Sequence, residues 1–253
     1  MMIAKSFSSK TLVMSLLGLW GFNAAANNSI GIGAGFGVSE YKEYESDTQA
    51  IPAINVSGER FYFRGMSAGM YLYKDSVNEV DLGLSYAAKK FKAEDSDDVH
   101  LQALDNRSDT GMADISYRFN HPDIGSLSVT ASADVLDKTD GGYKVDIGYR
   151  KNFRIAEFVV VSPGVGAIWF NDALSEHYYG ISGAESAVSG LDEYHPEDNI
   201  STYVGLGCRV FLSKQLALFA NGQYLFLSDE ITSSPMVDRD YSISASVGLS
   251  FNF

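Results

Sequence analysis

The chain has 253 residues, a formal net charge of −13 and one cysteine, Cys208. The acidic balance argues against a nucleic-acid partner, which would need a basic surface, and one cysteine permits no intramolecular disulfide. The 15 Tyr, 15 Phe, 24 Gly and only 5 Pro suit many strands joined by turns, and no apolar run reaches the roughly 18 residues that predict a membrane helix.

Residues 1–26 have the pattern of a secretory signal peptide. Lys5 and Lys10 precede an apolar run over residues 11–20, and alanines at 24–26 offer small residues for cleavage. The run is too short to favour a retained anchor helix, and no cysteine follows it to carry a lipid. We therefore predict cleavage near Ala26 and export of residues 27–253, as one domain, through the periplasm.

From Ser29 onward, apolar residues occupy every second position, which is the period of a β-strand. In the first such segment, residues 30–38, the intervening positions are Gly31, Gly33, Gly35 and Gly37. We expect an inner face of almost bare backbone there, which leaves space inside the fold. A polar loop over residues 40–47 and a strand near residues 48–56 follow. Residues 57–73 form either two short strands or one bent strand.

The same alternation recurs to the end of the chain, and charged residues within these segments fall on one face only. The segments are residues 80–86, 113–119, 127–135, 143–149, 159–169, 204–210, 216–226 and 241–253. The last has only Ser, Gly or Asn between its apolar positions. Such a long strand, with hydrocarbon on one face and small polar groups on the other, is typical of transmembrane β-barrels. Its final aromatic residues, Phe251 and Phe253, are similar to the C-terminal signal that the barrel-insertion machinery reads.

The connections between the segments indicate the topology. Short connections alternate along the chain with longer, acidic ones. The short connections are residues 74–78, 120–123, 151–156 and 213–214, and the long ones are residues 92–109, 136–142, 171–199 and 228–239. Short turns of outer-membrane barrels face the periplasm and long loops face outside, so both chain ends should lie in the periplasm and the strand number should be even. We predict an all-β fold, a closed antiparallel transmembrane β-barrel in the Gram-negative outer membrane. It has twelve strands if residues 57–73 form two, and ten is the alternative.

The charged face of the strands is also rich in Gly and Ser, as the crowded interior of a closed barrel requires. We expect acids and bases on this face to meet across the lumen, and so to fill and polarise it. The acids are Asp81, Asp114, Asp134 and Asp146, and the bases are Arg118, Lys144, Arg150 and Arg209.

The longest loop carries a distinctive order of residues: Tyr178, Tyr179, Gly180 and Ile181, then Glu185, then Leu191 three places before Tyr194. This order resembles the corresponding segment of the MipA/OmpV family of Gram-negative outer-membrane proteins, the MltA-interacting protein family. The resemblance implies an outer-membrane barrel. Members are described as scaffolds that link a murein-degrading transglycosylase to a murein synthase, as porins, or as adhesins, and the resemblance does not select among these roles.

The aromatic residues of this loop have two interpretations. Tyr178, Tyr179 and Tyr194 would offer rigid contact area to a sugar or a protein, or they would pack the loop into the barrel mouth as a plug, which we favour. The glycines among them, such as Gly180 and Gly190, suit a tightly folded loop.

The residues able to do chemistry give little support to catalysis. His177 and His195 share a loop with several acids, but no pair has the close spacing of a helical zinc motif. Neither a Ser-centred motif nor the chain order of a hydrolase is present. We expect no enzyme activity, no metal and no cofactor. The acidic loops are expected to be solvated, and contact with divalent cations or lipopolysaccharide is the alternative.

The sequence therefore predicts a non-enzymatic outer-membrane barrel that acts as an interaction scaffold for cell-wall enzymes. The alternatives are a small-solute channel, which the glycine-lined first strand favours, and an adhesin that acts through the acidic loops. The expected partners are outer-membrane lipid and lipopolysaccharide, the barrel-insertion machinery, and a murein hydrolase or synthase.

Overall fold

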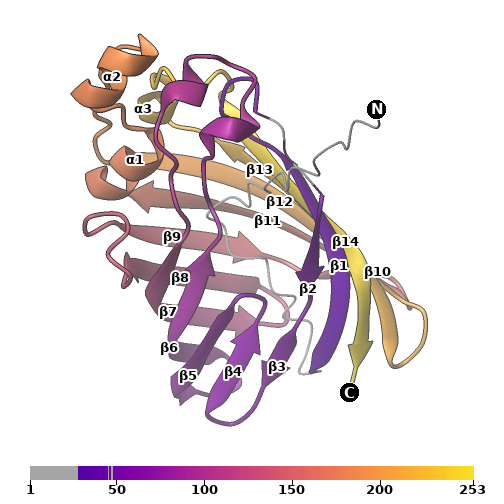
Figure 1. The fold of residues 1–253 in the computed structure, drawn as a ribbon. Helices are drawn as coiled ribbons and strands as arrows, with labels where there is room; N and C mark the ends of the chain where they lie inside the picture. Colours follow the sequence, from indigo (N-terminus) through magenta and orange to yellow (C-terminus); the bar gives the residue numbers. More distant parts are fainter. Residues whose placement is uncertain (1–27, 45, 47) are drawn as a thin grey trace, which may run out of the picture.

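The computed structural model describes residues 28–44, 46 and 48–253, so the predicted signal peptide lies outside the described part. The strands curl into one antiparallel sheet (Figure 1). The strands are β1 Ser29–Val38, β2 Gln49–Pro52, β3 Asn55–Ser57, β4 Phe61–Arg64, β5 Ser67–Lys74, β6 Asn78–Ala87, β7 Thr110–His121, β8 Gly125–Asp134, β9 Tyr143–Arg150, β10 Phe153–Ala156, β11 Val159–Phe170, β12 Asn199–Phe211, β13 Leu216–Phe226 and β14 Tyr241–Asn252. The helical segments are η1 Ala93–Asp95, η2 Leu101–Ala103, α1 Asp172–Tyr179, α2 Gly183–Ser189 and α3 Asp229–Thr232. Within the described residues, none of the helices combines the length and the apolar character needed to cross a bilayer.

Each strand pairs with its neighbours along the chain, and β14 pairs with β1 to close the sheet. Two membrane strands are interrupted: β2 and β3 both pair with β1, and β9 and β10 both pair with β11. The barrel therefore has twelve strands, as predicted, rather than ten. Residues 57–73 contain the two short strands β4 and β5, whose hairpin turns at Gly65 with a positive φ of 59°.

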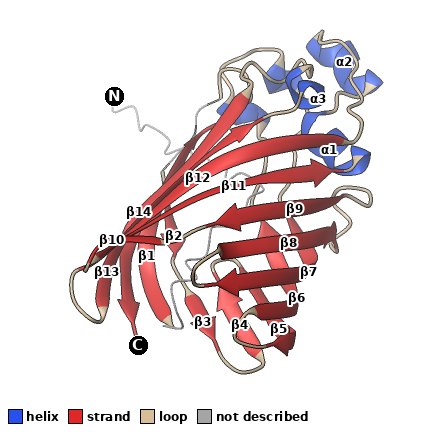
Figure 2. Cartoon of the chain, turned by 180° about the vertical axis from the view of Figure 1, so that it is seen from behind, coloured by secondary structure: helices blue, strands red, loops and turns tan. Residues whose placement is uncertain are grey.

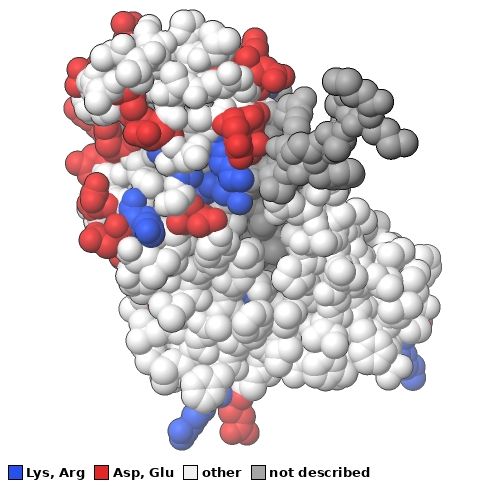
Figure 3. Space-filling view, in the orientation of Figure 1, with Lys and Arg blue, Asp and Glu red and all other residues white. Residues whose placement is uncertain are grey.

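The two faces of the strands are sorted as the alternation predicts. Apolar side chains on the outer face are exposed, for example Ile32 at 65% and Leu84 at 62%. The barrel band is almost free of charge in the space-filling view, while most acids gather over the helical end (Figure 3). Aromatic residues lie on the outer face near the helical end, as in the interfacial girdles of membrane barrels. They are Tyr86, Tyr143, Trp169, Tyr224, Phe226 and Tyr241.

The glycines on the inner face of the barrel were expected to leave empty space, but in several places an aromatic side chain fills that space. A Cβ added at Gly33 would lie 3.0 Å from Cζ of Phe219, and one at Gly248 would lie 2.5 Å from the same atom. On the neighbouring strands β11 and β12, a Cβ at Gly166 would lie 2.3 Å from Cζ of Tyr203. Large aromatic side chains therefore lie flat over the glycines, which is a known way to pack glycine in a sheet. At these positions the glycine backbone forms the surface against which Phe219 and Tyr203 pack.

This packing gives a testable prediction for Gly166. The substitution Gly166→Ala would place a methyl group against the Tyr203 ring and 2.6 Å from the carbonyl oxygen of Ile147. We expect it to lower the free energy of unfolding by about 1–3 kcal/mol, as overpacking does. The measurement is urea unfolding of the refolded chain in lipid vesicles.

Gly222→Ala is the matched control. It also lies within a strand, β13, but its Cβ would meet no atom within 4 Å. Its stability should stay at or slightly above that of the wild type, because alanine restricts the unfolded chain more than glycine does. Equal losses for the two variants would contradict the packing account.

The helical segments collect at one end of the barrel, opposite the C-terminus (Figure 2). The long connections meet there, so this end is extracellular by the rule that short turns face the periplasm. Local sequence explains the helices. Asn171 caps α1 by accepting a hydrogen bond from the Leu174 amide at 3.1 Å, and Ser182 with Glu185 forms a capping box at α2.

Candidate functional site

The extracellular loops fold together over the barrel mouth. We call the described residues of 39–48, 88–109, 171–198 and 227–240 the lid. Their apolar side chains form one buried cluster with inward-facing residues at the top of the strands. Its largest fully buried members are Tyr41, Tyr178, Phe91, Leu101, Met112, Ile168, Leu174, Ile181, Ile231 and Met236. The lid is therefore a packed structure with its own apolar core, while many of its acidic residues, such as Asp192 and Glu193, are exposed.

A buried ion pair lies within this cluster. Nζ of Lys89 contacts Oε1 of Glu40, and the Tyr179 hydroxyl donates to the same oxygen at 2.7 Å. The side chains of Lys89 and Glu40 are 4% and 1% exposed. Nζ of Lys89 also lies 4.5 Å from the centre of the Tyr179 ring, within cation–π distance. We call Glu40, Lys89 and Tyr179 the latch, because they join three different loops.

The electrostatics of the latch keep Glu40 charged. Burial by itself raises the pKa of the Glu40 carboxyl, but attraction to Lys89 and hydrogen bonds from Lys89 and Tyr179 outweigh it, so the pKa is lowered. The pKa of Tyr179 is raised well above its usual value by burial and by the Glu40 charge. At neutral pH the latch therefore contains a Glu40 carboxylate, held by contacts from Lys89 and from the neutral Tyr179 phenol.

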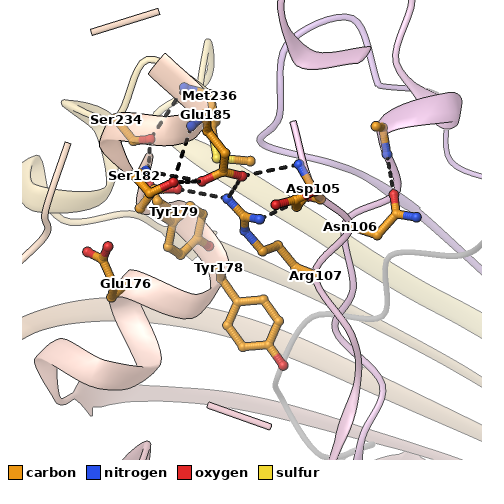
Figure 4. Close-up of polar contacts among 12 residues, drawn as sticks. Asp105, Asn106, Arg107, Glu176, Tyr178, Tyr179, Ser182, Glu185, Ser234 and Met236 are labelled. Carbon is orange, nitrogen blue, oxygen red and sulfur yellow. Dashed lines mark hydrogen bonds and ion pairs between the residues drawn. The ribbon is translucent and has the colours of Figure 1, made fainter. Parts of the chain in front are cut away.

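A second ion pair fixes the loop of residues 171–198 to the loop of residues 88–109. Nη2 of Arg107 lies 2.6 Å from Oε1 of Glu185 and donates to the Gly180 carbonyl at 3.0 Å. The same Glu185 oxygen accepts from the Asp105 amide at 3.1 Å. Figure 4 shows Arg107 reaching from its loop toward Glu185 and Ser182. The pair thus connects the capped start of α2 to the neighbouring loop.

The other residues of the predicted loop motif also belong to the lid. Tyr178 is fully buried, and its carbonyl accepts from the Tyr41 hydroxyl at 3.0 Å. Gly190 ends α2 with a φ of 74°, and Leu191 packs against the lid core. Tyr194 pairs with Ile181 through backbone hydrogen bonds of 2.8 and 3.0 Å, and its hydroxyl donates to the Glu230 carbonyl at 2.6 Å.

Some of the predicted lumen charges meet in a network on the wall formed by β4 to β7. Nη1 of Arg118 lies 2.5 Å from Oδ2 of Asp81 and 2.6 Å from Oε1 of Glu79. Glu79 also pairs with Arg64 at 2.9 Å, and Asp81 accepts from the Tyr62 hydroxyl at 2.7 Å. The sequence prediction missed Glu79 and Arg64, although strand parity places both on the inner face.

The remaining predicted lumen charges have different surroundings. Asp146 accepts from the Tyr203 hydroxyl at 3.0 Å and lies near Lys144. Asp114 and Arg209 are buried on the inner faces of β7 and β12, and Arg150 is at the end of β9. Asp134 ends β8 at the extracellular side. It accepts from Thr110 and from the amides of residues 136, 138 and 139, so it caps a loop at the end of the strand.

The histidines and the C-terminal aromatics complete the predicted residues. His195 contacts Glu176 and Glu193 at 3.0 and 2.9 Å in an exposed position. In the described part of the chain, no group of three or more His, Cys, Asp or Glu side chains is arranged to hold a metal ion. Phe251 pairs with Ile30 on the outer face, and the Phe253 amide donates to the Asn28 carbonyl at 2.9 Å. The insertion role of these two residues stays a prediction.

Acid is expected to loosen the lid before the barrel. Because the pKa of Glu40 is lowered in the folded chain, its stabilisation is present above the unfolded pKa of about 4.3 and is lost as the pH falls below that value. Hydrogen exchange of the Lys42 and Asp238 amides, which bond to Met236 and Glu40 carbonyls, should lose protection in that range. Strand amides such as that of Val204 should keep theirs, and equal loss at both places would contradict the prediction.

Comparisons with known proteins agree with this fold. The family model of the MltA-interacting protein MipA matches residues 30–253. The MltA-interacting protein of Escherichia coli K12 is 35% identical over 232 residues, which is 91% of this chain and 92% of that protein. The 24 kDa outer membrane protein of Pasteurella multocida Pm70 is 22% identical over 254 residues, covering 97% and 98%.

Two solved outer-membrane structures share the barrel fold. The NanC porin has a TM-score of 0.52 at 7% identity, covering 88% of this chain and all of that chain. An outer membrane channel from Pseudomonas putida F1 has a TM-score of 0.50 at 10% identity, covering 90% and 96%. Together with the sequence matches, these likenesses place the chain in the outer membrane of Gram-negative bacteria. The chain belongs to the MltA-interacting protein MipA family of outer-membrane β-barrels.

Proposed function

We propose that this protein is a non-enzymatic outer-membrane scaffold that binds a murein-processing enzyme through its periplasmic turns. The observation that carries the proposal is the 35% identity, over more than nine-tenths of both chains, to a protein named for its interaction with MltA. The packed lid is compatible with it, because the extracellular loops bury apolar side chains against one another while short turns at the periplasmic end expose theirs.

The periplasmic end offers apolar contact residues for such a partner. Ile124, Phe158 and Leu212 lie at or beside three separate turns and are more than half exposed. Apolar turn tips of this kind are suitable anchors for a protein interface, since buried aromatic and aliphatic anchors carry most of the binding energy. Charged residues of both signs lie nearby in the chain and would form the polar rim of such an interface: Lys151, Arg154 and Lys214 with Asp123 and Glu157.

The test is binding of the soluble domain of an MltA-type transglycosylase to the detergent-solubilised barrel by surface plasmon resonance. We expect Phe158→Ser combined with Ile124→Ser to weaken binding by about tenfold or more, the effect of losing a hot spot. Val188→Ser is the control, because Val188 is exposed on α2 at the opposite end. Unchanged binding by the turn variant, or no binding by the wild type, would argue against the scaffold.

A small-solute channel is the second candidate, and the charged residues of the lumen favour it. Five bases and four acids face inward on β4, β6, β7, β9 and β12: Arg64, Arg118, Lys144, Arg150 and Arg209 with Glu79, Asp81, Asp114 and Asp146. Single-channel recording of the folded chain in a planar bilayer separates the candidates. Steady openings of the wild type would support the channel. Silence from demonstrably folded protein would support a barrel closed by its lid.

A further inference from the structure

The corner between α1 and α2 is braced by a later segment of the same loop. Ile181 and Tyr194 form an isolated antiparallel bridge, with backbone hydrogen bonds of 2.8 and 3.0 Å. Tyr179, whose hydroxyl belongs to the latch, lies two residues before this bridge. Residues 192–195 therefore support the corner from which Tyr179 reaches Glu40.

His195 fastens this segment to α1. Its Nδ1 lies 3.0 Å from Oε1 of Glu176, which is in α1, and its Nε2 lies 2.9 Å from Oε1 of Glu193. An ionised carboxylate only accepts hydrogen bonds, and a neutral imidazole has one N–H donor and one acceptor nitrogen. Both contacts are hydrogen bonds only when both ring nitrogens carry a proton. The geometry therefore fits the imidazolium form of His195.

The glycine at position 180 leaves room for one of these carboxylates. A Cβ added at Gly180 would lie 2.5 Å from Cδ of Glu176 and 2.6 Å from Oε1, the oxygen that contacts His195. The φ of Gly180 is −73°, which any residue can adopt. The Glu176 carboxylate therefore depends on the missing side chain of Gly180 and not on an unusual backbone. A Cβ at Gly183 would lie 3.4 Å from Oε2 of Glu193, which is an ordinary contact.

Two carboxylates face the His195 ring, Glu176 from α1 and Glu193 from its own segment. Among the described residues, neither forms an ion pair with another base. Figure 4 shows Glu176 on the opposite side of the corner from Arg107. The carboxylate of Glu230, in α3, instead accepts from a backbone amide of this loop at 2.9 Å. Hydrogen bonds to Glu193 and Glu176, together with the charge of Glu176, raise the pKa of His195.

We propose that His195 is a proton-dependent clip in the lid, which as an imidazolium holds residues 192–195 against α1 and as a neutral imidazole releases Glu176. Because the pKa of His195 is raised in the folded chain, the clip is fully formed below the unfolded pKa of about 6.5 and is lost as the pH rises through the folded pKa. It thus works in the opposite direction to Glu40, whose contribution is lost in acid. The clip is separate from the periplasmic scaffold role, and its test involves no partner.

The first experiment is NMR titration of the full mature chain in detergent micelles, with ¹³C at Cε1 of its four histidines. We expect the midpoint of His195 to lie above the unperturbed value of about 6.5 and that of His177 to lie below it, because burial lowers the pKa of His177. Glu176→Gln and Gly180→Ala should each lower the midpoint of His195, while the matched control Gly183→Ala should leave it nearly unchanged. A midpoint of His195 that is not raised, or that stays the same in Glu176→Gln, would overturn the proposal.

Hydrogen exchange then tests whether the clip acts on the corner. After correction for the intrinsic exchange rate, protection of the Ile181 and Tyr194 amides should fall several-fold between about pH 6 and about pH 9, as the ring loses its proton. His195→Gln should remove this pH dependence, because a glutamine side chain does not titrate. His121→Gln, at the periplasmic end of β7, should retain it. Equal pH dependence of Tyr194 protection in the wild type and in His195→Gln would also overturn the proposal.

Discussion

Lys89→Met is expected to release the lid while the barrel stays folded. The substitution leaves the Glu40 carboxylate buried without its ammonium partner, and breaking a buried pair in this way costs about 3–5 kcal/mol. The lid depends on the latch because Glu40, Lys89 and Tyr179 come from three loops. Trypsin should then cleave at Arg107 in the variant and spare it in the wild type, where its side chain is only 11% exposed.

Two further variants separate the latch from a general loss of charge. Lys90→Met removes the neighbouring lysine, which is only partly buried, and should leave cleavage at Arg107 unchanged. Glu40→Leu combined with Lys89→Met replaces the pair by apolar groups and should restore most of the protection, since such replacements are often neutral. Protection of Arg107 in Lys89→Met equal to that of the wild type would contradict the role of the latch.

Val247→Arg is expected to destabilise the whole barrel. Val247 lies in β14, pairs with Ala34 of β1 and Ala220 of β13, and is 47% exposed on the outer face. A charged arginine there would lie in the lipid near the middle of the strand, at a cost of about 2–4 kcal/mol. The free energy of unfolding in vesicles, from urea titration of tryptophan fluorescence, measures the loss.

Ser244→Arg is the matched control in the same strand. Strand parity places Ser244 on the inner face, where it pairs with Gly37 and Gln223 and is half-buried. An arginine there can reach polar lumen groups, so its cost should be clearly smaller. Equal tolerance of the two substitutions would contradict this assignment of the faces of β14, and a larger cost for Ser244→Arg would show that the faces are exchanged.

The barrel could be predicted from the sequence because the residue pattern that specifies each strand lies within that strand. Alternation with period two defines a strand and its two faces, and regular apolar positions such as those from Tyr241 to Phe253 distinguish a lipid-facing strand from a soluble one. The lengths of the connections then determine which end faces outside. The twelve strands, the closed sheet and the exposed outer face follow from these rules and are confirmed by the structure.

The inner face could be predicted only in part. Parity identified Asp81 and Arg118, which do pair, but Asp134 is also on that face and caps a loop at the strand end. The glycines of β1 suggested empty space, whereas Phe219 lies over Gly33. The partner of an inner-face residue depends on its position along the barrel axis and on side chains from strands that are distant in the sequence. Neither can be deduced from the pattern of one segment.

The sequence by itself determined the barrel, its faces and its orientation, because each strand carries its own period. The tertiary structure alone decided the lid and the latch. Glu40 and Lys89 are charged residues in polar loops, and only the closure of the sheet brings those loops together and removes water from their ion pair.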